Sequence, residues 1–368
     1  MRQASRRRTG WAAARVALAA ILVMPATSVG SALAQVPAKQ LFGAKRLPAA
    51  TAPVVHGFYS KGCIQGAVAM PIDGPAWQAM RLSRNRRWGH PDLVKLLVRL
   101  SQDGRRVGWN GLLVGDLSQP RGGPMLTGHA SHQIGLDADI WLNPMPGRRY
   151  SYQERENTSA RSMLASRKGK DGKWRLDQNR IGERFTQATY AIIRTAASYR
   201  EVERVLVHPT IKRELCRRAK GEGDRRWLYK VRPYWGHHYH MHIRMGCPAG
   251  SPNCRPQATP RNDDGCGAEL AYWHRQLNPP RPKKVVKKAR KPKVVKKRRK
   301  REKLLSDLPR ACTGVLQAAA PVSEQAATLK LADGIAYAPT LQPAPAADAI
   351  GALIRAGKVT RPTFRPQG

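Results

Sequence analysis

Four residues in two short stretches form a set that could hold a catalytic metal ion. One stretch offers His132 and Asp139, seven positions apart, and a much later one offers His240 and His242, two apart. Two imidazoles and one carboxylate are a common protein ligand set for a catalytic zinc ion, which keeps one position open for water. Histidines two apart on a strand point to the same face, so the second pair can address a single centre.

The density of histidines favours a shared site over chance clustering or scattered surface histidines. The chain has ten histidines, and six of them lie within residues 128–139 and 235–242. The spacing differs from the helical His-Glu-x-x-His arrangement. No cysteine accompanies the histidines, which argues against a structural zinc. There is no Gly-rich phosphate loop either, so nothing supports nucleotide binding.

Both stretches resemble the penicillin-insensitive murein endopeptidases, a branch of the zinc peptidases grouped with lysostaphin and the D-Ala-D-Ala carboxypeptidases. That group shows His-x6-Asp followed much later by His-x-His. The longer form Gly-His-Ala-Ser-His-Gln-x-Gly-Leu-Asp-x-Asp, here residues 128–139, is specific to the endopeptidase branch. The resemblance runs from about Lys61 to Leu277 and resumes around Cys312. Further matching segments are residues 89–94, 211–216, 231–233 and 264–270.

The resemblance implies a role for each candidate residue. Three zinc ligands and one further candidate ligand are expected, namely His132, Asp139, His242 and His129. His240 and His237 are expected to line the site, His240 as general base or as the imidazolium that stabilises an oxyanion. Asp137 shares the strand face of Asp139, so it either orients a ligand histidine or makes a local cap or salt bridge.

Two further features bear on metal and substrate binding. Some family structures hold a second, peripheral metal near an Asp-Gly-Lys-His stretch, which reads Asp-Gly-Lys-Trp here. Asp171 is therefore only a weak second-metal candidate, and one zinc ion is expected. Basic residues near the cleft, Arg244 and those of residues 143–180, are candidates for holding the carboxylates of a cross-link.

The implied activity is hydrolysis of the D-alanyl to meso-diaminopimelyl peptide bond in peptidoglycan cross-links by a zinc-activated water. Ser131 is the only serine in the cluster, and its neighbours do not form a Gly-x-Ser-x-Gly elbow. No serine acyl-enzyme is implied, which would explain indifference to β-lactams. Two alternatives stay open: a zinc carboxypeptidase that trims terminal D-Ala, and a non-catalytic wall-binding protein.

The start of the chain predicts export to the periplasm. Residues 1–34 combine a basic start, an apolar run and an Ala-Leu-Ala cleavage site, so the mature chain would begin at Gln35. The apolar run is too short to stay as a membrane span. Removing five arginines with the signal lowers the formal net charge from +42 to +37. Anionic envelope polymers are therefore expected partners, rather than nucleic acid.

The cysteine count agrees with an exported protein. Six cysteines in such a chain predict three disulfides, and spacing alone leaves fifteen pairings open. No Cys-x-x-Cys spacing suggests a metal site instead. The family resemblance implies the pairs Cys63–Cys312, Cys216–Cys266 and Cys247–Cys254.

The apolar patterns predict an α+β domain over residues 61–278, in which a small, mostly antiparallel sheet carries the zinc site between helices and long loops. The clearest period-2 signal, in residues 235–245, places His240, His242 and Arg244 on one face. The other expected strands are residues 67–71, 107–114, 136–142 and 205–207. The expected helices are residues 91–100, 185–199 and 209–220, and residues 143–180 read as a long surface loop.

The ends of the chain differ in composition from this domain. Residues 281–303 hold fifteen Lys or Arg and one acid, which cannot build a core and predicts an extended, disordered segment. This segment is either an electrostatic tether to anionic polymer or a solvated linker. It forms most of a disordered basic loop expected at residues 279–303. The other expected parts are a lead-in at residues 35–60, a returning segment with Cys312 at 304–316, and a disordered Ala/Pro-rich tail at 317–368.

Overall fold

The computed structural model describes residues 36–280 and 301–330. The predictions for residues 1–34, for most of the basic loop and for residues 331–368 lie outside the described residues. Within the described ranges, no helix is long and apolar enough to cross a membrane. The helices are α2 (Ala38–Gly43), α3 (Pro91–Arg106), α4 (Tyr152–Asn157), α5 (Gln187–Ser198), α6 (Pro209–Arg218), α7 (Ala268–Leu277) and α8 (Ala311–Gln317).

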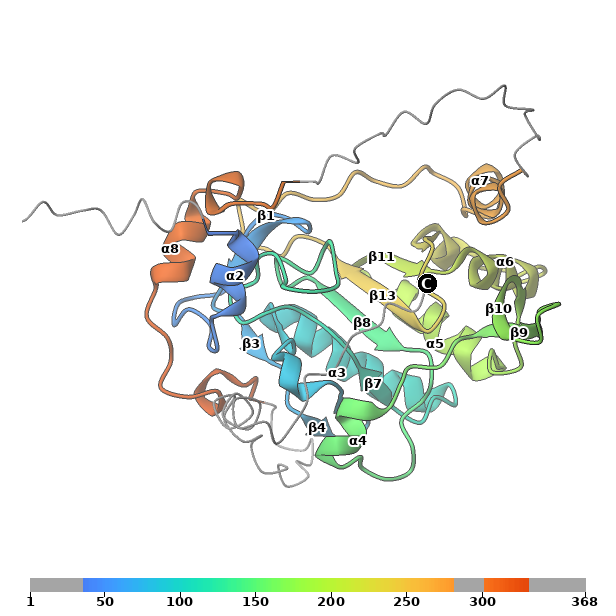
Figure 1. Cartoon of the computed structure of the whole chain (residues 1–368), viewed down its shortest axis with the longest axis horizontal. Helices are drawn as coiled ribbons and strands as arrows, with labels where there is room; N and C mark the ends of the chain where they lie inside the picture. Colours follow the sequence, from blue (N-terminus) through green and yellow to red (C-terminus); the bar gives the residue numbers. More distant parts are fainter. Residues whose placement is uncertain (1–35, 281–300, 331–368) are drawn as a thin grey trace, which may run out of the picture.

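One sheet of seven strands runs through the middle of the molecule (Figure 1) in the order β12-β11-β13-β8-β7-β5-β4. Its strands are β4 (Asp73–Gly74), β5 (Trp77–Ala79), β7 (Leu112–Val114), β8 (Asp137–Trp141), β11 (Val202–Val207), β12 (Val231–Pro233) and β13 (His240–Met245). Only the β11–β12 and β5–β7 pairs are parallel. The mixed sheet and its helices confirm the predicted α+β class.

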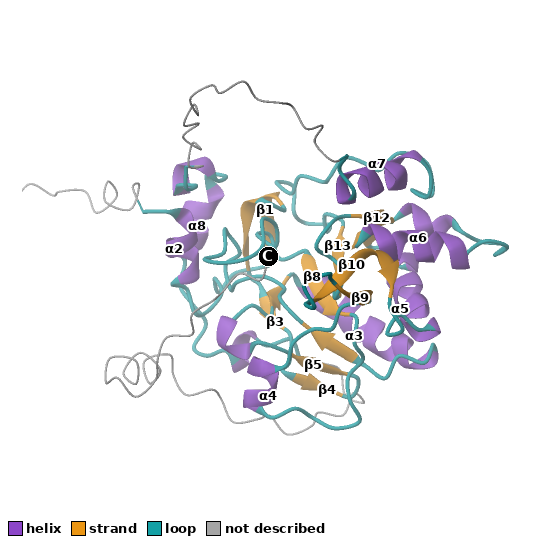
Figure 2. Ribbon diagram, turned by 45° about the vertical axis from the view of Figure 1, so that its right-hand side comes forward, coloured by secondary structure: helices purple, strands orange, loops and turns teal. Residues whose placement is uncertain are grey.

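Smaller sheets flank the main one (Figure 2). They pair β1 (Val54–Phe58) with β2 (Lys61–Gln65), β3 (Val68–Ala69) with β6 (Trp88–Gly89), and β9 (Leu164–Lys168) with β10 (Trp174–Ile181). The β9–β10 hairpin and the capped helix α4 lie within residues 143–180, so the prediction of one long loop there was wrong. Their side chains are mostly polar and are exposed or half-buried, which leaves no buried stripe for a pattern to reveal.

Helix α3 extends six residues beyond its predicted end because its last turns are still packed. Gly104 is buried, and a Cβ there would lie 2.8 Å from the side chain of Ile192 on α5. The two helices therefore approach closely at a residue that has no side chain. The core cluster joins apolar residues of both helices to alternate positions of β8 and β13, among them Ile140 and Ile243.

Glycines shorten two predicted strands. The strand expected at residues 107–114 is limited to β7, because Gly108 and Gly111 have φ of 81° and 142°, which breaks the extended backbone. The strand expected at residues 235–245 begins only at β13, since Gly236 has φ of 86° in the preceding turn.

The lead-in and the beginning of the tail are more ordered than predicted. The lead-in contains α2 and β1, and α2 lies beside α8 (Figure 1). Phe42 of α2 packs with the disulfide-bonded Cys63 and Cys312 and with apolar residues of α8. The described part of the predicted tail, residues 317–330, also lies against the domain: the Leu329 N–H donates to the Ala69 carbonyl at 2.9 Å. The structure forms three disulfides, in the pairing that the family resemblance implies.

Candidate metal centre

The register of two neighbouring strands assembles the centre of the site. In the antiparallel pair of β8 and β13, His242 lies opposite Asp139 and Arg244 lies opposite Asp137. Directly opposed residues share a face of the sheet, so a histidine and a carboxylate meet across the strands. Both side chains are almost completely buried.

The loop before β8 adds His132 in an unusual backbone conformation. His132 has φ of 63°, a left-handed value that non-glycine residues rarely adopt. Its N–H donates to Asp137 Oδ2 at 2.9 Å, and its Nδ1–H donates to the Leu117 carbonyl at 2.6 Å. These two bonds hold a strained residue in place, as is common at functional sites.

Three donor atoms then converge. His132 Nε2 lies 3.1 Å from His242 Nδ1, and Asp139 Oδ1 lies 3.4 Å and 3.0 Å from these two nitrogens. Atoms that bind one tetrahedral zinc at about 2.0–2.2 Å are separated by roughly 3.3–3.6 Å. The observed separations are close to that range, so the three residues fit a single metal ion.

The far side of each imidazole is already hydrogen-bonded. His132 uses Nδ1 toward the Leu117 carbonyl, and His242 Nε2 lies 3.1 Å from Asp137 Oδ1. When both outer nitrogens carry the proton, both inner nitrogens present lone pairs to the same point. A cation bound between these two lone pairs and the Asp139 carboxylate would satisfy all three groups.

Asp137 is the buried link between this centre and the sheet. Its carboxylate accepts from the Arg244 guanidinium at 2.7 and 3.1 Å, in addition to its bonds to the two histidines. Although burial raises the pKa of Asp137, Arg244 and His242 outweigh burial and hold the pKa below its usual range. The expectation that Arg244 holds substrate is wrong: it is buried, bound to Asp137 and stacked over Tyr59 at 4.0 Å.

His129 approaches the second oxygen of the Asp139 carboxylate. Its Nδ1 lies 3.5 Å from Asp139 Oδ2, and its Nε2 lies 2.9 Å from Asp116 Oδ2. His129, His132 and Asp139 offer donor atoms that all lie within 4.8 Å of one another. His129 is thus placed where a further ligand would sit.

Asp116 is a site residue that the motif reading did not single out. It is buried, and its Oδ2 also lies 3.0 Å from Arg84 and from Arg86. Burial raises the pKa of Asp116, but the hydrogen bond with His129 and the two guanidinium groups bring it below its usual range. The available signal was its position two residues after the apolar residues of β7.

His240 and His237 lie beside the donor atoms. His240 Nε2 is 3.6 Å from Asp139 Oδ1, while its buried Nδ1 has no hydrogen-bond partner. Burial lowers the pKa of His240 to about 4 and that of His237 to about 3. The ring of His237 lies 4.8 Å from that of His240. His238 is half-buried, and its Nδ1 lies 3.0 Å from the Ser162 hydroxyl.

Asp171 is not brought to this centre. It lies in the turn between β9 and β10, where its carboxylate pairs with Arg175. Its neighbour in the motif, Trp174, is 70% exposed. Asp171 therefore pairs with an arginine, and Trp174 stands where the family stretch has a histidine.

Comparisons with known proteins identify the family of the chain. A family model described as penicillin-insensitive murein endopeptidase matches residues 55–317. A protein of that name from Klebsiella pneumoniae subsp. pneumoniae is 42% identical over 226 residues, which are 61% of this chain and 77% of the relative. Proteins of the same name from Yersinia enterocolitica and Haemophilus influenzae are 40% and 42% identical, over 63% of this chain and 80% and 76% of theirs. The chain therefore belongs to the penicillin-insensitive murein endopeptidase family.

Proposed function

We propose that this chain is a zinc endopeptidase that hydrolyses the D-alanyl to meso-diaminopimelyl cross-links of peptidoglycan. The observation that carries the proposal is the convergence of His132 Nε2, His242 Nδ1 and Asp139 Oδ1 within 3.0–3.4 Å of one another. The names of the relatives support murein as the substrate.

The three converging residues would hold the zinc ion, and His129 Nδ1 would be a fourth donor. When bound, zinc supplies Lewis acidity that polarises the scissile carbonyl and lowers the pKa of water. Asp137 would keep His242 in the tautomer whose Nδ1 is free to bind, because it accepts from Nε2. The Leu117 carbonyl would do the same for His132 through the other ring nitrogen.

His240 would act as the general base. Burial lowers its pKa to about 4, so the imidazole is neutral at the pH of the envelope and can accept a proton from water. The low pKa favours this role over a preformed imidazolium. The protonated ring can then give its proton to the departing amino group, and neighbouring His237 would line the same wall of the site.

The same residue set accounts for indifference to β-lactams. These compounds act by acylating a nucleophilic serine, and no serine is assigned a role in this chemistry. The reaction would proceed by direct attack of water on the peptide carbonyl, without a covalent intermediate.

We also place the protein in the periplasm, with peptidoglycan as its partner. Three disulfides suit an oxidising compartment, in agreement with the signal expected at residues 1–34. The attraction to anionic envelope polymers is proposed from the composition of residues 281–303.

Digestion of purified sacculi by residues 35–368 tests the function directly. Cross-linked muropeptide dimers should disappear and monomers accumulate, a chelator should stop the reaction, and added zinc should restore it. Asp139→Asn should be inactive, whereas Asp171→Asn, which alters an exposed ion pair, should be fully active. Release of D-Ala from unchanged dimers would instead identify a carboxypeptidase. Tight binding without any product would identify a wall-binding protein.

A further inference from the structure

Four aromatic residues on the loop after β12 and on α7 are here termed the aromatic ridge: Tyr234, Trp235, Tyr272 and the half-buried Trp273. Tyr234 is 47% exposed, Trp235 66% and Tyr272 50%. Large exposed aromatic groups that gather in one place mark binding surfaces more often than isolated ones do. None of the four carries a charge, although the chain as a whole is strongly cationic.

The ridge is continuous with the site. The Trp273 ring lies 5.2 Å from that of Tyr234, which in turn lies 5.5 Å from His237. His237 is 4.8 Å from His240, the proposed base. A substrate held on the ridge would thus extend directly to the reacting groups.

Local structure displays Trp235 at the surface. It occupies a turn with Gly236, whose φ of 86° suits glycine, and the His237 Nδ1–H donates to the Trp235 carbonyl at 3.1 Å. The turn is tied on its other side by β12, which immediately precedes it. The backbone of this turn therefore places Trp235 at the surface.

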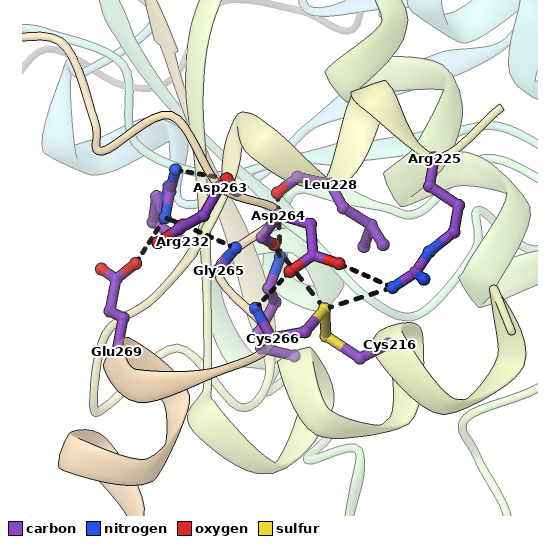
Figure 3. The surroundings of a disulfide bond; sticks show 10 residues. Cys216, Arg225, Leu228, Arg232, Asp263, Asp264, Gly265, Cys266 and Glu269 are labelled. Atoms are coloured by element: carbon purple, nitrogen blue, oxygen red, sulfur yellow. Dashed lines mark hydrogen bonds and ion pairs between the residues drawn. A yellow bond between two sulfur atoms is a disulfide. The ribbon is translucent and has the colours of Figure 1, made fainter.

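The other half of the ridge lies on α7, which a polar network fastens to the domain (Figure 3). Arg232 of β12 donates to Glu269 Oε2 on α7 at 2.5 Å and to Asp263 Oδ1 at 2.9 Å. The Cys216–Cys266 disulfide joins the start of α7 to α6. Arg232 thus ties α7 to β12, and the disulfide ties α7 to α6.

We propose that the aromatic ridge binds the glycan strand of peptidoglycan while the adjacent site cuts the peptide cross-link. The proposal rests on the proposed function, which supplies peptidoglycan as the substrate. A pyranose ring has an apolar face of C–H groups that packs on an aromatic face, while its hydroxyl groups stay in water. The peptide stems carry carboxylates, which cationic side chains bind, whereas the aromatic ridge offers the ring faces on which a sugar can pack.

Binding of peptide-free glycan strands tests the ridge without any need for catalysis. Trp235→Ala should weaken binding about tenfold, which corresponds to about 1.4 kcal/mol, and Trp235→Phe should recover most of it. Trp174→Ala is the matched control, because Trp174 is 70% exposed but lies on the β9–β10 hairpin. Absence of binding by the wild type, or an equal loss in the control variant, would overturn the proposal.

A second comparison separates glycan from peptide recognition. The rate on intact sacculi, divided by the rate on cross-linked peptides freed of glycan, should fall about tenfold in Trp235→Ala. An unchanged ratio would show that the ridge acts on peptide or not at all, and would refute the proposal. A wild type that cut neither substrate would contradict the proposed function, and strand binding would still decide the role of the ridge.

Discussion

Asp137 shows how one buried carboxylate can serve both stability and the site. It accepts from the His132 backbone and from His242, and it neutralises Arg244, which is itself buried. Substitution Asp137→Asn removes the charge but keeps the shape. We expect a loss of about 3–5 kcal/mol in the free energy of unfolding, because the guanidinium stays buried without a counter-charge.

Asp137→Asn should also weaken zinc binding about 10–100-fold, since the partner that orients a ligand histidine is weakened. Urea unfolding and competition with a chelator measure the two effects. Asp171→Asn removes an exposed carboxylate and should change neither. Wild-type zinc affinity in Asp137→Asn would show that His242 needs no orienting partner.

His240 and His132 are expected to respond differently to truncation. His132→Ala should lose both bound zinc and hydrolysis, because His132 Nε2 faces the two other donors. His240→Ala should retain zinc and lose hydrolysis by roughly 10²–10⁴-fold, as expected for a general base. Zinc content by atomic absorption and dimer cleavage provide the two measurements. A zinc-free His240→Ala would reassign this residue as a ligand.

The sequence predicted where site side chains lie when they follow the period of a strand. It did not predict the positions of side chains that depend on loop geometry. Alternation placed His240 and His242 on one face, and β13 has this arrangement. Nothing local shows that His132 adopts a left-handed φ. The contact between Asp116 and His129 arises because a loop folds back over the end of β7, which is a tertiary event.

At the scale of elements, α6 carries a lysine that should make stability depend on pH. Lys212 is fully buried, and its Nζ donates to the carbonyls of Leu228 and Asp264 at 2.9 and 2.6 Å. Burial lowers its pKa from 10.5 to about 7. Below pH 7 Lys212 is protonated in both the folded and the unfolded chain. The cost of burying its charge then lowers the free energy of unfolding by its full amount.

Between pH 7 and about 10.5 the folded chain has released the proton that the unfolded chain still binds, so the free energy of unfolding should rise with pH. A pKa difference of this size corresponds to at most about 5 kcal/mol. Urea unfolding between pH 7 and 10 measures the effect. As the pH rises from 7 to 10, the free energy of unfolding of the wild type should increase relative to that of Lys212→Met, whereas parallel curves would show that Lys212 stays charged in the fold.

Element boundaries were predicted well where apolar residues repeat and poorly where polar residues are ordered. Helix α5 lies within its predicted range, whereas the β9–β10 hairpin was read as loop because both its faces are largely exposed. The end of α3 was missed for another reason. Gly104 looks like a helix terminator by propensity, yet here it allows close contact with α5.

At the scale of the whole molecule, the described segment after the basic loop is fastened back onto the domain. The Arg121 guanidinium, almost fully buried, donates to the carbonyls of Val315, Leu316 and Ala318 at 2.6, 3.0 and 2.8 Å. These bonds and the Cys63–Cys312 disulfide fix the chain again after the basic segment. A segment of high positive charge is thereby attached to the domain on both sides.

The disulfides should therefore contribute unequally to stability. Cys63 and Cys312 are 249 residues apart, whereas Cys247 and Cys254 are separated by seven. Closing the longer loop removes more entropy from the unfolded chain, and the difference is about 3 kcal/mol at 25 °C. The double variant Cys63→Ala/Cys312→Ala should lose that much more free energy of unfolding in urea than Cys247→Ala/Cys254→Ala. Equal losses would mean that Arg121 and the α2–α8 cluster, rather than the covalent bond, hold the two ends together.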